Sequence, residues 1–232
     1  MGKSNDQPLH VDVAQFDSLD HALERIVLSK PFEDLAAQIM RSYIGRDGQW
    51  SLPFAFFSSA VSRARALHEA IVREIHATNP PASISLLRQL SETVAMTFYV
   101  ADNPDYVKVL ATPPADKKPG EANRKSMQKL VNHMDSRYTD QFGVVYSDMC
   151  EMTHFGTSAL WSSHDVAERD DGTVSMSWSS VPGWKYESDA LVCCALLLEL
   201  TSGMTTALNH LGETLMRLAE VEAATARAQD HL

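Results

Sequence analysis

The chain has 232 residues, of which 44% are hydrophobic and 22% are charged, and its formal net charge at pH 7 is −10. These values are ordinary for a globular protein with a sizeable core. The acidic balance argues against a protein whose whole surface binds nucleic acid, because clustered Lys and Arg carry phosphate binding. We therefore expect a single helical-bundle domain over residues 1–232.

The cysteines and the lengths of the apolar runs indicate where in the cell the protein is found. Cys150, Cys193 and Cys194 form neither a C-x-x-C motif nor an even disulfide framework, which favours a reducing compartment. The first residues lack the apolar core of a signal peptide, and the apolar run 190–198 is shorter than the roughly 20 residues that cross a bilayer. We expect a cytoplasmic protein with no membrane partner.

The N-terminal third predicts three helices after a flexible N-terminus over 1–17. Ser18 is placed as the N-cap of a short helix that ends near residue 30. A second helix is predicted over 31–45. A long third helix is predicted over 54–78, where Asn79 and two prolines end it.

The segment 83–100 is apolar on nearly every face and predicts a central helix with Ser83 as its N-cap. Its only charges, Arg88 and Glu92, lie four residues apart and so share one face. An unpaired charge there would be strongly penalised. We expect both side chains to face the helix 144–155 and to reach His154, either as a polar site in the core or as a structural ion-pair network.

The middle of the chain predicts a short helix near 106–110, a mobile loop over 111–122 and helices over 121–141 and 144–155. A β-hairpin insertion is predicted over 159–180, because Val174, Met176 and Trp178 alternate with serines after an Asp-Gly turn. The hairpin should lie on the bundle or meet a partner chain, since a lone two-stranded ribbon is marginal. Its tryptophans, Trp161, Trp178 and Trp184, are interpreted as anchors.

The last helix is predicted over 187–228, so the fold class is a mostly α, multi-helix bundle with a small β-hairpin between the last two helices. Leucines 208, 211, 215 and 218 repeat at helical spacing. A helix of about 60 Å exceeds such a bundle, so we expect a bend near Gly203 or Gly212, or a protruding arm. The spacing predicts a homo-oligomer, a homodimer in the simplest case, formed through this helix.

Two patterns suggest chemistry. Asp148, Glu151 and His154 follow one another at i, i+3 spacing, and Glu-x-x-His is an element of di-iron bundles. The chain has one copy where such bundles use two, so we expect no metal or other cofactor and interpret the three residues as a solvated acidic face with a hydrogen-bonded histidine. Cys150, four residues before His154, is interpreted as a structural cysteine rather than as half of a thiolate pair.

The segment Arg63 to His68 resembles the Arg-(four to six residues)-His pattern of ribonucleases in the helical HEPN superfamily, although Ala64 stands where that motif usually has a polar residue. RNA is therefore a weakly supported partner. The segments ASISLLRQLSETVAMTFY and YSDMCEMTHFG also resemble an uncharacterised bacterial helical-bundle family that is loosely HEPN-like. That resemblance implies a bundle fold and marks Arg88, Glu92, Tyr146 and His154, without implying an activity.

We expect an interaction or regulatory protein, with bacterial defence or mobile elements as one setting for it. The first alternative is a HEPN-like ribonuclease that uses His68 with Arg63, or His154 with Arg88, where His acts as acid or base and Arg stabilises phosphate charge. The second alternative is a metal-dependent bundle enzyme. The catalytic candidates are Arg88, Glu92, His154, Arg63 and His68.

Overall fold

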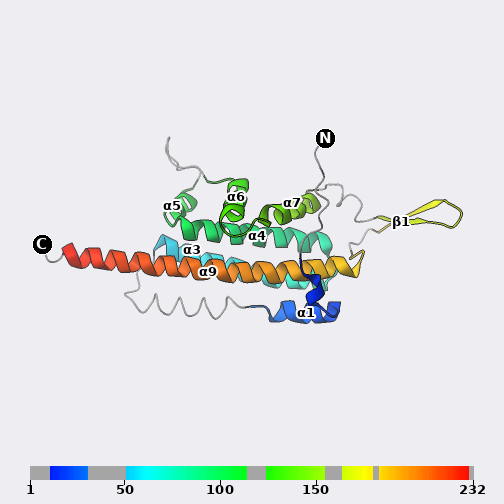
Figure 1. The fold of residues 1–232 in the computed structure, drawn as a ribbon, viewed down its shortest axis with the longest axis horizontal. Helices are drawn as coiled ribbons and strands as arrows, with labels where there is room; N and C mark the ends of the chain where they lie inside the picture. The colour runs from blue at the N-terminus through cyan, green and yellow to red at the C-terminus, as the bar shows by residue number, and fades with distance from the viewer. Residues whose placement is uncertain (1–10, 31–50, 114–123, 155–163, 180–182, 230–232) are drawn as a thin grey trace. The chain divides into compact units, whose positions relative to one another are not determined.

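The computed structural model of the chain describes residues 11–30, 51–113, 124–154, 164–179 and 183–229. These residues form a helical bundle with an antiparallel hairpin between its last two helices, which confirms the predicted fold class (Figure 1). The elements are, in chain order, η1 (Val13–Gln15), α1 (Leu19–Leu28), α3 (Leu52–His76), α4 (Pro80–Asp102), α5 (Tyr106–Ala111), α6 (Met127–Arg137), α7 (Phe142–Thr153), β1 (His164–Glu168), β2 (Val174–Trp178) and α9 (Glu187–Gln229).

The chain forms two compact units, each assembled from separate stretches of sequence. The first unit consists of Met1–Ser29, Leu67–Leu90 and Gln141–Glu199, and the second of Lys30–Ala66, Ser91–Asp140 and Leu200–Leu232. Helices α3, α4 and α9 therefore each supply residues to both units. The predicted helix over 31–45, most of the predicted loop over 111–122, and Trp161 lie outside the described residues.

In the first unit, α1 begins as predicted. The Ser18 side chain accepts a hydrogen bond from the backbone N–H of His21 at 3.2 Å, which satisfies one of the donors at the start of the helix. Residues 11–17 were expected to be flexible, but Val11 and Phe16 are buried and η1 lies between them. The Phe16 ring contacts two residues of α1: the guanidinium of Arg25 lies 5.3 Å from the ring centroid, and the His21 ring lies 6.3 Å away in an edge-on arrangement.

Two predicted helix starts were wrong. Helix α4 begins at Pro80, because a proline at the first helical position loses no hydrogen bond, so the two prolines start this helix instead of only ending the previous one. Ser83 lies inside the first turn, fully buried, where its hydroxyl donates to the Asn79 carbonyl at 2.9 Å. Helix α7 likewise begins before Gly143, which was expected to separate two helices.

In the second unit, α4 is the apolar helix that its sequence predicts. Its buried side chains include Val94, Phe98, Thr93 and Thr97. The Thr97 hydroxyl donates a hydrogen bond to the Thr93 carbonyl at 2.8 Å. A Cβ added at Gly203 of α9 would lie 3.7 Å from a Val94 methyl, an ordinary contact distance. Helices α4 and α9 therefore pack against each other at this level.

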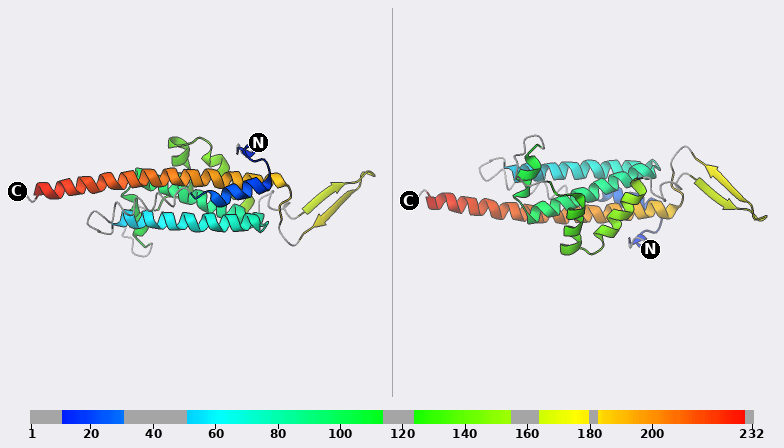
Figure 2. Two further views of the ribbon diagram at one scale, coloured as in Figure 1. Left: turned by 90° about the horizontal axis from the view of Figure 1, so that it is seen from below. Right: turned by 90° about the horizontal axis from the view of Figure 1, so that it is seen from above.

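Helix α9 runs for 43 residues without a break in its secondary structure, so neither Gly203 nor Gly212 interrupts it (Figure 2). At 1.5 Å per residue it is about 65 Å long. Its apolar residues are buried at Leu208, Leu211 and Leu215, but Leu218 is 37% exposed and Val221 is 60% exposed. The end of the helix thus carries apolar side chains that the described chain leaves partly exposed.

The hairpin has the predicted strands and turn. β1 and β2 are antiparallel, with Val166 opposite Met176 at the centre, and Gly172 occupies the turn with a positive φ of 77°. The tryptophans differ in their surroundings. Trp184 is half-buried and donates its indole N–H to the Ile75 carbonyl at 3.4 Å, as expected of an anchor, whereas Trp178 is 68% exposed.

Candidate functional site

Arg88 and His154 meet in the first unit, as the sequence predicts. The Arg88 Nη1 atom lies 2.6 Å from His154 Nε2 and donates to the Thr153 hydroxyl at 3.2 Å. A guanidinium has donors only, so Nε2 of His154 must be the unprotonated ring nitrogen in this contact, and the ring proton is on Nδ1. Protonation of His154 at Nε2 would break the contact.

This pair lies near the surface, whereas the sequence placed it in the core. Arg88 is half-buried and His154 is exposed, because His154 is the C-cap of α7 and follows the last helical residue. Glu92, one turn further along α4, belongs to the second unit and is half-buried. Tyr146 is half-buried on α7. The supported site is thus an arginine, a threonine and a histidine at the end of α7.

The predicted Arg63 and His68 pair does not form one accessible site. His68 is 1% exposed, and its Nε2 is 3.0 Å from the Ser29 hydroxyl, while Arg63 is exposed and donates from Nε to the Thr93 hydroxyl at 3.2 Å. Five residues along a helix turn the side chain by about 140°. The His68 side chain is therefore directed into the protein interior, and the Arg63 side chain is directed towards solvent.

The sequence predicted no metal site and named Asp148, Glu151 and His154 only as candidates for one. Within the part of the chain that the structure describes, no group of three His, Cys, Asp or Glu side chains could hold a metal ion. The i, i+3 spacing of Asp148, Glu151 and His154 requires a continuous helix, and α7 ends at Thr153. Burial raises the pKa of Asp148, as expected for a carboxyl turned partly inward.

A second polar cluster, in the second unit, has more hydrogen bonds and was missed by sequence reasoning. Asp102, the last residue of α4, receives hydrogen bonds at 2.8 Å from the Tyr138 hydroxyl and from His133 Nε2 on its Oδ2 atom. It receives another at 2.8 Å from His210 Nε2 on Oδ1. Arg137 adds a positive charge, with its Nε atom 3.7 Å from Oδ2. We call these five residues the Asp102 cluster.

The aspartate of this cluster is the buried member. Its side chain is 11% exposed, against 17% for His133, 36% for His210 and 60% for Arg137. Burial raises the pKa of Asp102, but the hydrogen bonds from His210, Tyr138 and His133 and the charge of Arg137 outweigh it, so that the pKa lies below its ordinary value. The carboxylate is therefore ionised and joins the ends of α4, α6 and the middle of α9.

Aromatic rings complete the surroundings of the cluster. The Tyr138 ring lies 4.1 Å from Phe98 between centroids, and the His133 ring lies 5.0 Å from Tyr99 in an edge-on arrangement. Burial, the hydrogen bond to Asp102 and its negative charge raise the pKa of Tyr138 to about 12. The phenol is thus held protonated as a donor. This arrangement orients both histidines and links α6 to α9 through hydrogen bonds to the same carboxylate.

A third feature is the uncovered end of α9. The side chains of Leu208, Leu211, Leu215 and Leu218 lie within about 80° of one another around the helix, and Val221 lies about 60° beyond Leu218. The first three side chains are buried and the last two are exposed. The same helix also passes a test of length and composition for crossing a membrane over Glu187–Leu218, with an 18-residue window of mean hydropathy 1.7 that is 56% buried. Buried core helices pass that test too, so it is a weak indication.

Comparison with known proteins gives no further guide to these features: the chain matches no protein-family model, no curated protein and no solved structure.

Proposed function

We propose that the protein is a helical-bundle interaction protein that associates with a second copy of itself through the last part of α9. The observation that carries the proposal is the apolar face of α9, which continues past Leu215 to Leu218 and Val221, where 37% and 60% of the side chains are exposed. Regular apolar spacing on an uncovered helix is the pattern that partner helices use.

The expected contact is weak and reversible. About half of each Leu218 and Val221 side chain remains to be buried. Four such side chains in a pair of helices contribute roughly 3–6 kcal/mol, which reaches only the low end of the estimated cost of association. The contact therefore forms only at high protein concentration, and it responds to concentration, as a regulatory interaction requires.

Sedimentation velocity over a wide range of concentration tests the proposal. The wild-type chain should shift to a larger mass as its concentration rises, and Val221→Glu should remove the α9 contact, so that the mass rises less at each concentration. Met216→Glu is a matched control, because Met216 is 39% exposed but lies about 140° away from Val221 around the helix. A wild-type chain that stays monomeric, or a control that behaves like Val221→Glu, would refute the proposal.

A second candidate function, cleavage of RNA, has one observation in its favour. Arg88 and His154 lie 2.6 Å apart and His154 is exposed, so a phosphate group that draws the guanidinium away would free Nε2 of His154 to act as a general base beside a phosphate-binding arginine. Purified protein should then degrade a mixed RNA pool, His154→Ala should not, and Arg63→Ala should be unaffected. An intact RNA pool with and without divalent metal would eliminate this candidate.

A further inference from the structure

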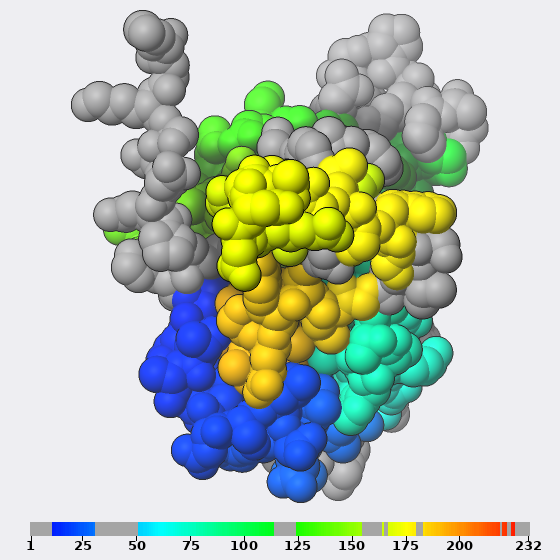
Figure 3. All heavy atoms as spheres, turned by 90° about the vertical axis from the view of Figure 1, so that its right-hand side faces the viewer, coloured from blue at the N-terminus to red at the C-terminus, as the bar shows by residue number. Residues whose placement is uncertain are grey.

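One face of the hairpin is apolar and exposed. Val174, Met176 and Trp178 are 65%, 60% and 68% exposed, and they alternate with Ser175 and Ser177 along β2. Because successive side chains of a strand point to opposite faces, the three large side chains share one face and the serines share the other. Figure 3 looks onto the hairpin residues, drawn in yellow. A two-stranded hairpin is marginal in water unless such a face is covered.

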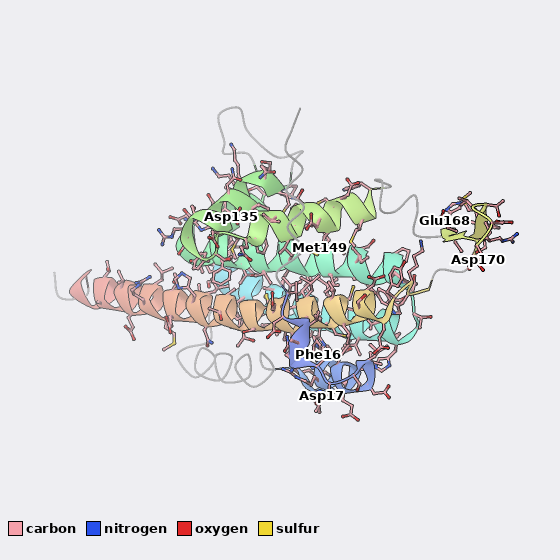
Figure 4. The ribbon with its side chains drawn as sticks, turned by 45° about the vertical axis from the view of Figure 1, so that its right-hand side comes forward. Phe16, Asp17, Asp135, Met149, Glu168 and Asp170 are labelled. Carbon is pink, nitrogen blue, oxygen red and sulfur yellow. The ribbon has the colours of Figure 1, made fainter. Side chains whose placement is uncertain are left out.

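The ends of this face differ in charge. By the strand register, His164 stands opposite Trp178 and Glu168 stands opposite Val174. Cross-strand neighbours share a face, so the apolar face is bordered by a histidine at one end and a carboxylate at the other. Glu168 lies next to the turn, close to Asp170 along the chain (Figure 4). The face is therefore polar at both ends, with an imidazole at one end and a carboxylate at the other.

We propose that this face binds the same face of a second copy of the chain, so that two hairpins form a small four-stranded sandwich. The two-fold axis lies in the plane between the two sheets, runs perpendicular to the strands and passes at the level of Met176. This axis reverses the strand direction and places β2 over β2 and β1 over β1. Trp178 of one copy then covers Val174 of the second copy, and His164 faces Glu168.

Two observations select a second copy as the occupant. The face is complementary to itself in size, because its largest and its smallest apolar side chains, Trp178 and Val174, are exchanged by the axis. Its polar ends are also complementary, because the same axis brings the His164 ring, a hydrogen-bond donor, onto the Glu168 carboxylate, an acceptor. An interface with two-fold symmetry requires a patch that matches itself in this way.

This contact goes beyond the proposed contact of α9 and is independent of it. A chain with two different two-fold interfaces can link copies into assemblies larger than a dimer. Each contact must therefore be tested with the other removed. A chain that carries Val221→Glu isolates the hairpin contact, whatever the outcome for α9.

Cross-linking tests which face of the hairpin is in contact. In the full chain with Val221→Glu and Cys150→Ser, Met176→Cys should give a covalent dimer with a short bis-maleimide, because the axis brings the two copies of residue 176 together. Ser177→Cys is the matched control on the opposite face and should stay monomeric. Equal cross-linking at both positions, which pairing at the strand edges would give, or no cross-linking at Met176→Cys, would overturn the proposal.

Charge reversal tests the direction of packing. Glu168→Lys places one lysine against each His164 and should weaken the hairpin contact roughly tenfold in sedimentation, since the two histidine–carboxylate contacts are lost. The double variant Glu168→Lys with His164→Glu should restore the wild-type affinity. Circular dichroism checks that each variant folds. Failure of the double variant to restore binding would contradict the proposed packing.

Discussion

Replacing Asp102 by Asn keeps the shape of the side chain but removes the negative charge that accepts hydrogen bonds from His133, Tyr138 and His210. A hydrogen bond to a charged group contributes about 1.5–3 kcal/mol, and an amide oxygen can keep at least one of the three. His210 and Tyr138 are each more than a third exposed, so water recovers part of the loss. We expect the free energy of unfolding to fall by about 2–4 kcal/mol.

Urea and thermal unfolding followed by circular dichroism measure this loss, which corresponds to roughly 5–15 °C for a chain of this size. Asp105→Asn is the matched control, because the Asp105 carboxylate is 91% exposed and contacts Lys108 at the surface. It should leave the midpoint unchanged. If Asp102→Asn also left the midpoint unchanged, the Asp102 cluster would not contribute to the stability of the second unit.

The acid dependence of this variant has a definite sign. The folded-state pKa of Asp102 lies below the ordinary value of 3.8, so the stability that its charge contributes is present above about pH 4 and is lost as the pH falls through the folded pKa. The difference between the wild-type chain and Asp102→Asn should therefore shrink below pH 4. A difference that stayed constant into stronger acid would contradict the assignment.

Three further predictions concern single residues. Ultraviolet titration should find one phenol with a pKa of about 12 that Tyr138→Phe removes; its raised pKa stabilises the fold below pH 10, and that stability disappears as the pH rises through 12. Burial raises the pKa of Cys193 and Cys194 to about 12, so thiol reagents at pH 8 should modify neither until the chain unfolds. Gly203→Ala should raise the free energy of unfolding by about 0.5–1 kcal/mol, because the new methyl meets Val94 at an ordinary distance; a loss of stability would contradict the close fit.

Local patterns were enough to predict much of the fold. The cap at Ser18 and the alternation of Val174, Met176 and Trp178 depend on neighbours within a few residues, and both were confirmed. The start of α4 was predicted wrongly, because two prolines can end one helix or begin the next. The choice at Pro80 depends on the packing of Ser83 in the core, which a local pattern does not contain.

The Asp102 cluster could not be predicted in this way. Asp102 is separated from His133 by 31 residues, from Tyr138 by 36 and from His210 by 108. Each residue taken alone has an ordinary place at a helix end or on a half-polar face. Only the packing of α6 and α9 beside the end of α4 brings them together. The one available signal was that His133 and Arg137 lie four residues apart on α6.

Arg88 and His154 are an intermediate case. The sequence predicted that they meet, because a charge on an apolar helix needs a partner, and the distance of 2.6 Å confirms the contact. It did not predict their exposure, because that depends on α7 ending at Thr153. The RNA cleavage experiment distinguishes a catalytic role for this pair from a structural one.

The most direct test of the central claim is energy transfer between two α9 helices. Donor and acceptor dyes are attached to separate samples of the full chain at Ala224→Cys, an exposed position beside Val221, with Cys150 replaced by Ser. On mixing, we predict transfer that rises with concentration and disappears when both samples carry Val221→Glu. Mixed samples with no transfer at high concentration, or with transfer that Val221→Glu leaves intact, would contradict association through α9.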